Sequence, residues 1–279
     1  HGHVFHSYFN SAKTRFFINA ERYLGRRSDA IIAISEQQKK ELVHDFKIAP
    51  EEKFRVVPLG FDLDRFRTNQ QEKRKKFRTE FGVSDDEIAI GIIGRLVPVK
   101  NHYLFLKAIR YVLDHSNKKI KAFIIGDGET RADLENMARE VNIRFSTEKD
   151  ASHPHPLVFN SWRGDVDVIN AGLDIVCLTS FNEGTPVSLI EAQAANKPIV
   201  STRVGGIADI VIEGQTALLA DIQDADGFCK HVLDLVQDDE LRKRMGAESH
   251  QHVMTRFSYQ RLVTDMSQLY FELLDKKSK

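Results

Sequence analysis

The sequence predicts an α/β protein with one complete, doubly wound parallel sheet and part of a second domain. From about Glu87 onward, short apolar runs alternate with longer segments whose apolar residues recur at helical spacing. Such an alternation typically forms a parallel sheet covered by helices on both faces. The apolar fraction of 42% and the charged fraction of 29% are those of an ordinary globular protein. A chain of 279 residues is therefore long enough to bury the core of such a sheet.

The apolar runs define the predicted elements in order. The runs that are short enough for buried strands lie at residues 88–93, 121–125, 157–159, 173–178 and 198–201. The segments with helical spacing lie at residues 102–115, 130–140, 186–195, 240–253 and 259–274. Together they predict a Rossmann-like domain over residues 76–258 and a separate final helix over 259–279.

A fainter copy of the pattern precedes this domain. Residues 30–34 and 54–57 are expected to be strands, and Ser35 is expected to cap a helix that begins at Glu36. A polar, charged stretch at 62–76 follows, and we predict a linker there, so that residues 1–75 hold the end of a first domain and the linker.

Composition limits the function classes. Cys177 lies in an apolar run and is expected to be buried and reduced, and two isolated cysteines among 11 histidines give no zinc spacing. No apolar run approaches the ~18 residues of a membrane-spanning helix. The chain opens at His1 rather than Met, so we expect a fragment or processed form, with the cytoplasm as the default location.

Charge is unevenly distributed along the neutral chain. Residues 1–80 hold 17 Lys and Arg against 11 Asp and Glu. A basic front part favours an anionic ligand or membrane surface, although a solvated basic face explains the count equally simply. The basic run at 73–78 has no interleaved aromatic pattern, and we interpret it as a solvated linker rather than a nucleic-acid site.

Three loops that follow predicted strands carry the candidate chemistry. The carboxyl ends of parallel strands form the ligand-binding edge of such a sheet. In the first loop, Gly94 permits a tight turn, and Arg95 and Lys100 supply positive charge before a helix N-terminus, a combination suited to a diphosphate. A surface turn with solvated cations is the simpler alternative for this loop alone.

The second loop leads into the predicted helix at 186–195. Gly184 allows close approach of a ligand, Thr185 is expected to cap the helix, and Glu183 precedes it. Dipole complementation alone explains a glutamate at that place. Glu191 instead lies near the apolar stripe of the helix, where a carboxylate is costly unless it is paired, and this favours a function.

Two glycine-containing loops admit either interpretation. The Gly205-Gly206 pair after the strand at 198–201, and the 126–129 loop, suit close approach of a ligand or simply a tight turn. No Gly-x-Gly-x-x-Gly, Walker loop or Gly-x-Ser-x-Gly follows a strand, which argues against a dinucleotide oxidoreductase, a P-loop nucleotidase and a serine hydrolase.

These loops, taken in order, resemble those of the retaining glycosyltransferases of family 4, which have the GT-B fold. The resemblance covers about residues 30–257, and its most specific element is the pair Glu183 and Glu191 in Glu-Gly-Thr-Pro-Val-Ser-Leu-Ile-Glu. Val57-Pro-Leu-Gly, Gly94-Arg-Leu with Lys100-Asn101, Gly126-Asp-Gly-Glu, the 159–165 segment and Val204-Gly-Gly match in register as well.

The resemblance implies a role for each residue. Arg95 and Lys100 would neutralise the donor diphosphate as the sugar bond breaks, which requires no metal or other cofactor. Glu183 would contact the sugar and Glu191 the ribose hydroxyls. The remaining donor-binding residues would be Gly94, Asn160, Trp162, Arg163, Gly184, Thr185 and Val187.

The chain start resembles the part of the family's first domain where a histidine lies near sugar and acceptor. His1 is the expected counterpart and His3 the alternative. Relatives carry about a hundred residues before this point, so we expect most of the acceptor domain to be absent and the fragment alone to be inactive. The final helix resembles the one that crosses back onto the first domain.

The implied function is transfer of a hexose from a nucleotide sugar, UDP-sugar favoured over GDP-sugar, to a glycan or lipid-linked acceptor. Surface polysaccharide or lipopolysaccharide synthesis is the expected setting, at the cytoplasmic membrane face, without nucleic acid. A non-catalytic nucleotide-sugar-binding module and a GT-B-fold epimerase are the alternatives. The intact Arg95, Lys100, Glu183 and Glu191 disfavour the first, and the paired glutamates disfavour the second.

Overall fold

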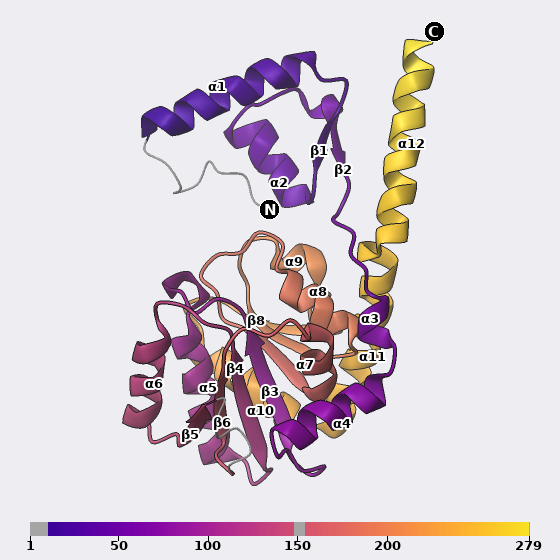
Figure 1. Cartoon of the computed structure of the whole chain (residues 1–279). Helices are drawn as coiled ribbons and strands as arrows, with labels where there is room; N and C mark the ends of the chain where they lie inside the picture. The colour runs from indigo at the N-terminus through magenta and orange to yellow at the C-terminus, as the bar shows by residue number, and fades with distance from the viewer. Residues whose placement is uncertain (1–10, 148–153, 279) are drawn as a thin grey trace. The chain divides into compact units, whose positions relative to one another are not determined.

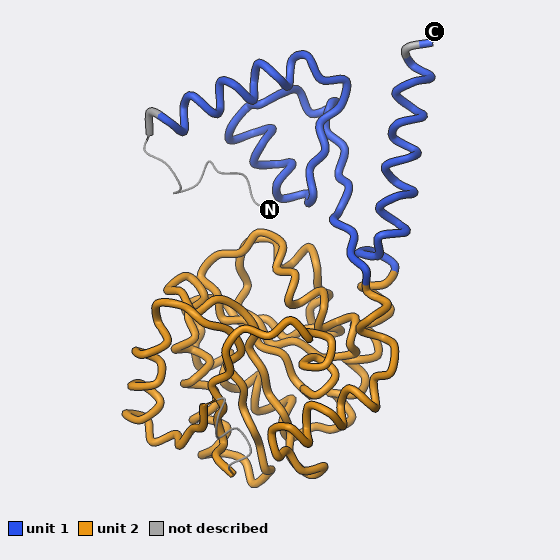
Figure 2. Tube along the Cα trace, viewed as in Figure 1, with its two compact units in different colours: residues 1–62, 255–279 blue, residues 63–254 orange. Residues whose placement is uncertain are grey.

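The structure, a computed structural model, describes residues 11–147 and 154–278. The chain divides into two compact units, coloured separately in Figure 2. Unit 1 comprises residues 1–62 and 255–279, and unit 2 comprises residues 63–254. The predicted α/β class is confirmed, because both units combine parallel strands with helices.

Unit 2 is built on a seven-stranded sheet in which all strand pairs are parallel. Its strands are β3 (Ile88–Ile93), β4 (Ile120–Ile125), β5 (Phe145–Thr147), β6 (Leu157–Asn160), β7 (Ile175–Leu178), β8 (Ile199–Thr202) and β9 (Ala217–Ala220). Every residue of β4, β6, β7 and β8 is buried, as expected for strands covered on both faces.

The strand order places a topological switch in the middle of this sheet. The order is β5-β6-β4-β3-β7-β8-β9, so the chain builds outward from β3 on one side and then restarts at β7 on the other. Ile92 of β3 pairs with Cys177 of β7. The carboxyl ends of β3 and β7 are therefore neighbours, and a crevice at such a point is the usual ligand site of an open α/β sheet.

Helices cover both faces of the sheet (Figure 1). One group packs through α5 and α10 and consists of α5 (His102–His115), α6 (Arg131–Glu140) and α10 (Ala225–Gln237). The other group packs around α7 and consists of α3 (Asp64–Arg67), α4 (Gln70–Glu80), α7 (Val166–Gly172) and α8 (Val187–Ala194). The remaining helical elements of this unit are η3 (Pro98–Lys100), α9 (Ile207–Ile210) and α11 (Asp239–Phe257), whose last residues belong to unit 1.

The strands and helices predicted for this unit are confirmed to within four residues at their ends, the largest difference being at the end of α11. The sequence patterns do not predict the two edge strands. Phe-Ser-Thr of β5 is too short and polar to stand out, and Ala-Leu-Leu-Ala of β9 has residues that favour helices. Their parallel pairing with β6 and β8 overrides these local preferences. The predicted cap on α8 is wrong, because Pro186 holds the N-cap position and no side chain caps it.

The linker predicted at residues 62–76 is wrong. Most of this stretch forms α3 and the start of α4, and the unit boundary lies at 62/63, so the predicted boundary at 75/76 falls inside α4. The stretch looks like a linker because its surface is highly charged. Phe77 nevertheless fixes it in place, because this side chain is fully buried.

The basic run 73–78 is likewise a packed helix rather than a solvated linker. Lys73 pairs with Asp167 at 2.8 Å, and Arg74 and Arg78 pair with Asp174 at 2.8 Å and 3.1 Å. These ion pairs join α4 to the α7 region, so three of the five cations of the run have protein partners, while Lys75 and Lys76 are exposed.

Unit 1 contains a two-stranded parallel sheet, β1 (Ile31–Ala33) and β2 (Phe54–Val56). Its helical elements are α1 (Ser11–Arg27), α2 (Glu36–Lys40), the π-helix η1 (Glu41–Asp45), the 3-10 turn η2 (Glu51–Lys53) and α12 (Tyr259–Lys277). The predicted cap at Ser35 is confirmed, since its hydroxyl accepts a hydrogen bond from the Gln38 amide at 3.1 Å. The final helix joins this unit through Tyr259, whose amide donates to the Phe61 carbonyl at 3.0 Å.

Candidate functional site

The candidate site lies at the carboxyl edge of the unit 2 sheet, where the loops after β3 and β7 meet. Lys100 comes from the first loop and Glu183 from the second. Lys100 Nζ donates to Glu183 Oε1 at 2.5 Å, and Ser180 Oγ donates to the same oxygen at 2.5 Å. The structure therefore brings together two of the predicted site residues, as a charge-assisted pair at the topological switch point.

This pair is accessible enough to exchange partners. The Lys100 side chain is 24% exposed and that of Glu183 is 10% exposed. The ammonium group has three donors, so it retains capacity for phosphate oxygens besides the Glu183 carboxylate. Positive charge at a switch-point crevice suits a diphosphate, and the adjacent carboxylate suits hydroxyl groups.

Hydrogen bonds to backbone carbonyls tie the two loops into one frame. The Phe181 amide donates to the Val99 carbonyl at 2.8 Å, and the Thr179 hydroxyl donates through Oγ1 to the Lys100 carbonyl at 2.8 Å. The Thr202 hydroxyl, at the end of β8, donates to the Ser180 carbonyl at 2.7 Å. The position of Lys100 opposite Glu183 therefore follows from this frame as well as from the ion pair.

Glycines allow neighbouring loops to stack on this frame. Gly126 has φ of 140°, and a Cβ there would lie 2.0 Å from the Gly94 carbonyl oxygen. Gly205 has φ of 49°, and a Cβ there would lie 1.8 Å from the Glu183 carbonyl oxygen. Both positions need the left-handed region and a close backbone approach, which only glycine provides. The sequence left open whether these glycines allow a ligand or another part of the chain to approach. In the structure, Gly126 and Gly205 allow the close approach of neighbouring backbone.

Glu191 lies one turn into α8, and its carboxylate is paired. Its side chain is 18% exposed, and Arg65 of α3 places Nη2 3.6 Å from Glu191 Oε1. Burial raises the pKa of Glu191, and the positive charge of Arg65 opposes that rise. The sequence analysis expected the Glu191 carboxylate to need a partner. Arg65 is that partner, and the sequence analysis did not predict it.

The other predicted residues belong to the same two loops and to the start of α8. Arg95 is exposed, and Gly94 donates its amide to the Ile125 carbonyl at 3.0 Å. Gly184 is exposed and Thr185 is partly buried. Val187 is the first residue of α8; the Leu189 amide of its first turn donates to the Pro186 carbonyl at 3.1 Å, and the amides of Val187 and Ser188 lie at the start of the helix, ahead of its internal hydrogen bonds.

Three predicted donor-binding residues follow β6. Asn160 is buried, and its carbonyl accepts from the Gly126 amide at 2.9 Å, whereas Trp162 is 59% exposed. The structure does not bring Arg163 to the Lys100–Glu183 pair. Its guanidinium instead forms ion pairs with Asp165 and Glu80.

His1 and His3 lie outside the described residues, so the structure does not place the predicted histidine. His102, which was not predicted, lies directly after the Lys100 loop. Burial, together with the nearby Lys100 charge, lowers the pKa of His102 to about 4, so the imidazole is neutral near pH 7. Neither ring nitrogen has a hydrogen-bond partner in the described structure.

Sequence reasoning also missed Asp127 and Ser161. Ser161 Oγ donates to Asp127 Oδ2 at 3.0 Å, and the Gly128 amide donates to Asp127 Oδ1 at 2.8 Å. The Gly128 amide and Ser161 hydroxyl lower the pKa of the Asp127 carboxyl. Only the order β6-β4-β3 brings these loops side by side, and residue spacing does not reveal that order.

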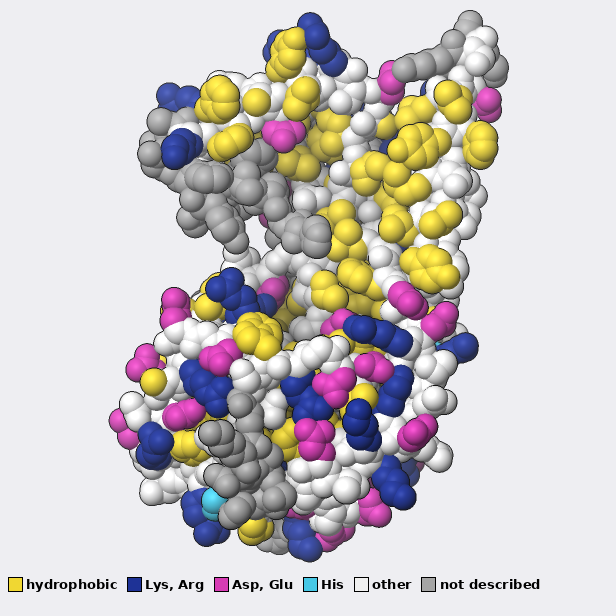
Figure 3. Space-filling view, in the orientation of Figure 1, with side chains coloured by type: hydrophobic (Ala, Val, Ile, Leu, Met, Phe, Trp, Pro, Cys, Tyr) yellow, Lys and Arg dark blue, Asp and Glu magenta, His cyan; other side chains and the backbone are white. Residues whose placement is uncertain are grey.

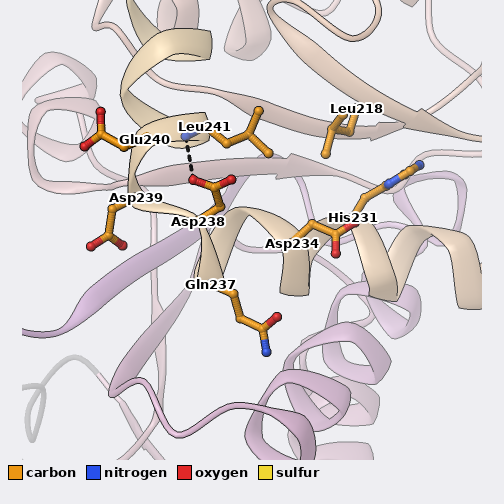
Figure 4. A pocket seen from close by; sticks show the side chains of 8 residues that line it. All are labelled: Leu218, His231, Asp234, Gln237, Asp238, Asp239, Glu240 and Leu241. Carbon is orange, nitrogen blue, oxygen red and sulfur yellow. Dashed lines mark hydrogen bonds between the residues drawn. The ribbon is translucent and has the colours of Figure 1, made fainter.

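A hollow elsewhere in unit 2 differs in chemistry from the candidate site. It has a volume of about 800 Å³ and lies where α10 meets α11 (Figure 4). Carboxylates dominate its lining: Asp234, Asp238, Asp239 and Glu240, beside Leu218, His231, Gln237 and Leu241. One of them, Asp238, caps α11 by accepting from the Leu241 amide at 2.8 Å. An acidic hollow repels a diphosphate, and no predicted site residue lines it.

The described residues contain neither a metal-binding cluster nor a membrane-spanning helix. Within residues 11–147 and 154–278, His, Cys, Asp and Glu form no group of three that could hold a metal ion, and metal independence stays a prediction. No helix of the described chain is long and apolar enough to cross a membrane. Cys177 is buried and free, as predicted, and Cys229 is buried and free as well.

A family model described as "Glycosyl transferases group 1" matches residues 73–252, and one described as "Glycosyltransferase Family 4" matches residues 1–65. The first match alone covers more than half of the chain. The chain therefore belongs to the group 1 glycosyl transferases, and the resemblance noted in the sequence is confirmed.

Individual relatives agree with this family. The D-inositol 3-phosphate glycosyltransferase of Corynebacterium jeikeium is 30% identical over 259 residues, which are 91% of this chain and 59% of the relative. The Escherichia coli UDP-Gal:alpha-D-GlcNAc-diphosphoundecaprenol alpha-1,3-galactosyltransferase is 24% identical, over 99% of this chain and 69% of the relative. The chain thus spans less than two thirds of the corynebacterial enzyme.

Solved structures share the fold. The Anabaena protein HepE in complex with UDP superposes with a TM-score of 0.80 at 18% identity, covering 94% of this chain and 68% of HepE. WaaG, a glycosyltransferase involved in lipopolysaccharide biosynthesis, superposes with a TM-score of 0.69 at 18% identity, covering 84% of this chain and 60% of WaaG. The predicted GT-B type of fold is confirmed by these neighbours.

Proposed function

We propose that this chain is the donor-binding part of a retaining glycosyltransferase that moves a hexose from a nucleotide sugar to a glycan or lipid-linked acceptor. One observation carries the proposal. Lys100 and Glu183 meet at 2.5 Å at the switch point, beside an exposed Arg95 and the start of α8. A cation pair for phosphates and a carboxylate for sugar hydroxyls are what such a donor requires.

In this proposal the cations act on the leaving group. As the anomeric carbon–oxygen bond breaks, negative charge grows on the diphosphate, and Lys100 and Arg95 stabilise it from fixed positions. The free amides at the start of α8 add positive potential. Glu183 accepts hydrogen bonds from the sugar. The incoming acceptor hydroxyl attacks from the face that the diphosphate leaves and passes its proton to the departing diphosphate oxygen, which gives retention.

We favour a UDP-sugar as donor, with a GDP-sugar second. HepE has been solved in complex with UDP and with UDP-glucose, and the Escherichia coli relative is named for UDP-Gal. That relative's name also includes a diphosphoundecaprenol acceptor, and WaaG belongs to lipopolysaccharide biosynthesis. These names support a lipid-linked acceptor and a role in surface polysaccharide or lipopolysaccharide synthesis.

The test is calorimetric titration of the chain with UDP, GDP and NAD, without added metal. We expect one nucleoside diphosphate to bind, with affinity reduced about tenfold or more in Lys100→Ala and Glu191→Ala, because each removes a charged hydrogen-bonding partner. Lys243→Ala and Glu240→Ala are matched controls, since these two residues pair only with each other on the surface. Preferential binding of NAD, or binding unaffected in both site variants, would refute the proposal.

Two alternatives make different predictions. A non-catalytic binding module would bind donor in the full-length protein without consuming it in the presence of any acceptor. An epimerase would convert the free nucleotide sugar into its epimer without an acceptor. Donor hydrolysis or transfer in the full-length protein, followed by the configuration of the product at the anomeric carbon, separates all three.

A specific surface supports peripheral membrane association at the cytoplasmic face. On α1, Phe16, Tyr23 and Leu24 are 69%, 53% and 55% exposed, and Arg27 lies 4.5 Å above the Tyr23 ring. Figure 3 shows hydrophobic and basic side chains together over this helix. Exposed aromatic residues with flanking cations are typical of helices that lie in an anionic membrane interface, and we propose that α1 docks there.

Vesicle sedimentation tests this docking. Vesicles of phosphatidylglycerol and phosphatidylcholine should pellet the chain at low salt and release it at high salt, whereas phosphatidylcholine alone should not bind. Phe16→Ser with Tyr23→Ser should abolish pelleting. Tyr270→Ser on α12, where Tyr270 is 62% exposed, controls for the loss of an exposed aromatic ring. Equal pelleting of the α1 and α12 variants would rule out this docking surface.

A further inference from the structure

The ion pair between Arg65 and Glu191 connects the candidate donor site to the first helix of unit 2. Arg65 belongs to α3, which begins two residues after the unit boundary at 62/63. Its Nη2 lies 3.6 Å from Glu191 Oε1. No motif in the sequence joins these positions, and the proposed function has used Glu191 alone.

Arg65 is the main interaction of the Glu191 carboxylate. The described structure gives this carboxylate no hydrogen bond, and 3.6 Å is an ion-pair distance rather than a hydrogen bond. A carboxylate has about four acceptor positions, so Glu191 keeps the capacity to accept from two hydroxyl groups while Arg65 remains beside it. The arrangement supplies charge without filling the acceptor positions.

The backbone of Arg65 is held from several directions. Leu63 and Phe66 are each 2% exposed, so α3 is anchored by buried side chains on both sides of Arg65. Lys73 Nζ donates to the Arg65 carbonyl at 2.5 Å and also pairs with Asp167 at 2.8 Å. The Arg65 guanidinium therefore extends toward α8 from a fixed support.

The charges around Glu191 determine whether its carboxylate is ionised, and Arg65 is one of them. Burial raises the pKa of Glu191, Asp167 of α7 raises it further through its negative charge, and Arg65 of α3 lowers it. Lys73 of α4 is occupied by Asp167. Arg65 is thus the cation that favours the ionised form, in which both oxygens are acceptors only, whereas protonation turns one of them into an O–H donor.

We propose that Arg65 is a positioning residue for the donor site, which fixes the Glu191 carboxylate as a hydrogen-bond acceptor for the vicinal hydroxyl groups of the donor's ribose. The inference rests on the proposed function, because it takes Glu191 as the residue that binds these hydroxyls. It adds that α3, at the junction with unit 1, contributes to donor affinity without contacting the donor.

The pH dependence of donor binding distinguishes this role from a merely structural one. UDP-glucose is the probe, since its bridging diphosphate lacks the terminal phosphate group that titrates at about pH 6. Calorimetry at pH values between about 5.5 and 8 would compare the wild-type chain with Arg65→Gln, Arg65→Lys and Arg67→Gln. Arg67 is exposed on the same short helix, so its replacement removes the same charge without touching Glu191.

We expect Arg65→Gln to weaken UDP-glucose binding by up to about fivefold near neutral pH, the size of a partly exposed ion pair. The deficit should grow as the pH falls, because Glu191 without Arg65 takes up its proton at a higher pH. Arg65→Lys should restore most of the affinity, and Arg67→Gln should follow the wild type. In a Glu191→Gln background, Arg65→Gln should have no further effect.

Two failures are distinguishable. If the wild type binds UDP-glucose and Glu191→Ala weakens binding, but Arg65→Gln follows Arg67→Gln at every pH, the proposed function stands and the role of Arg65 is wrong. If the folded wild type binds neither UDP-glucose nor a GDP-sugar, the proposed function fails and the role of Arg65 fails with it. Thermal unfolding of each variant confirms that the samples compared are folded.

Discussion

Unit 2 contains two clusters of charge that differ in how many partners each charged group has. At the junction of α4 and α7, Arg78 is 4% exposed and donates to the Asp174 carboxylate and to the backbone carbonyls of Ser84 and Glu87. Asp174 also accepts from Arg74 and from the Ala89 amide at 2.8 Å. At the carboxyl edge of the sheet, Lys100 is 24% exposed and pairs with Glu183.

The difference separates charges that hold the fold from charges that are available to a ligand. Removing the carboxylate of the α4–α7 cluster leaves the buried Arg78 guanidinium without its charged partner, which is costly. Removing Glu183 from the pair at the sheet edge leaves the Lys100 ammonium, which is 24% exposed and which water still reaches. The two clusters should therefore respond oppositely when stability and donor binding are measured on the same variants.

The largest expected effect is on stability. Asp174→Ala should lower the free energy of unfolding by about 3 kcal/mol, because it leaves Arg78 buried without its carboxylate partner. Urea unfolding measures this change. Asp86→Ala removes an exposed carboxylate that pairs with Lys119 and should leave the midpoint almost unchanged. If both variants unfold at the wild-type midpoint, the α4–α7 cluster does not hold the fold.

The buried lysine beside that cluster gives the next effect. Lys197 donates to the Ala171 carbonyl at 3.1 Å, and burial lowers its pKa to about 8. The unfolded chain keeps the ordinary pKa of about 10.4, so it binds the proton more tightly, and stability should rise with pH between these two values. The full gain is about 3 kcal/mol relative to Lys197→Met, whose unfolding should not show this rise.

Gly205 tests whether the backbone of the donor edge is as rigid as the α4–α7 cluster. Alanine at φ of 49° and with Cβ 1.8 Å from the Glu183 carbonyl oxygen requires the loop to move. We expect a loss of about 1–2 kcal/mol in stability together with weaker donor binding. Gly214→Ala is the control, because it has φ of 76° but nothing within 4 Å of its Cβ. Equal donor affinity in the two variants would show that loop stacking does not shape the site.

The smallest expected effect concerns Glu183 itself. In the wild type, Lys100 must loosen its ion pair with Glu183 in order to bind the diphosphate. Glu183→Gln removes that competing charge, so UDP should bind up to about fivefold more tightly. UDP-glucose should lose its advantage over UDP, since Glu183 is proposed to contact the sugar. Calorimetry of both ligands measures the two changes, and the unfolding midpoint should stay near the wild-type value. Weaker UDP binding would place Glu183 on the nucleotide rather than the sugar.

Local patterns predicted much of this molecule. Apolar runs such as Ile88–Ile93 located the strands, and the loops after them contained Lys100 and Glu183. That these two side chains meet follows from the strand order β4-β3-β7, which residue spacing does not determine. The resemblance to a family predicted the role of each site residue, and the structure identified which residues contact them, such as Arg65 beside Glu191.

Other features were hidden for physical reasons. Residues 62–76 were assigned to a linker because charged residues dominate the surface of α4, while the buried Phe77 gives only a weak apolar signal. Arg65 was missed because its partner Glu191 is distant in sequence. Arg163 was assigned to the donor from its place after β6, yet it pairs with Glu80 and Asp165, and its role toward the donor stays a prediction.

The backbone frame at the carboxyl edge has a consequence for how such proteins diversify. The loops are joined by the bond from the Phe181 amide to the Val99 carbonyl and by the hydroxyls of Thr179 and Thr202, and Thr185 and Trp162 take no part in these bonds. Replacing Thr185 or Trp162 would therefore reshape the surface offered to a sugar or base while these bonds stay in place. A change of donor preference is then accessible by single substitutions that leave the supporting frame intact.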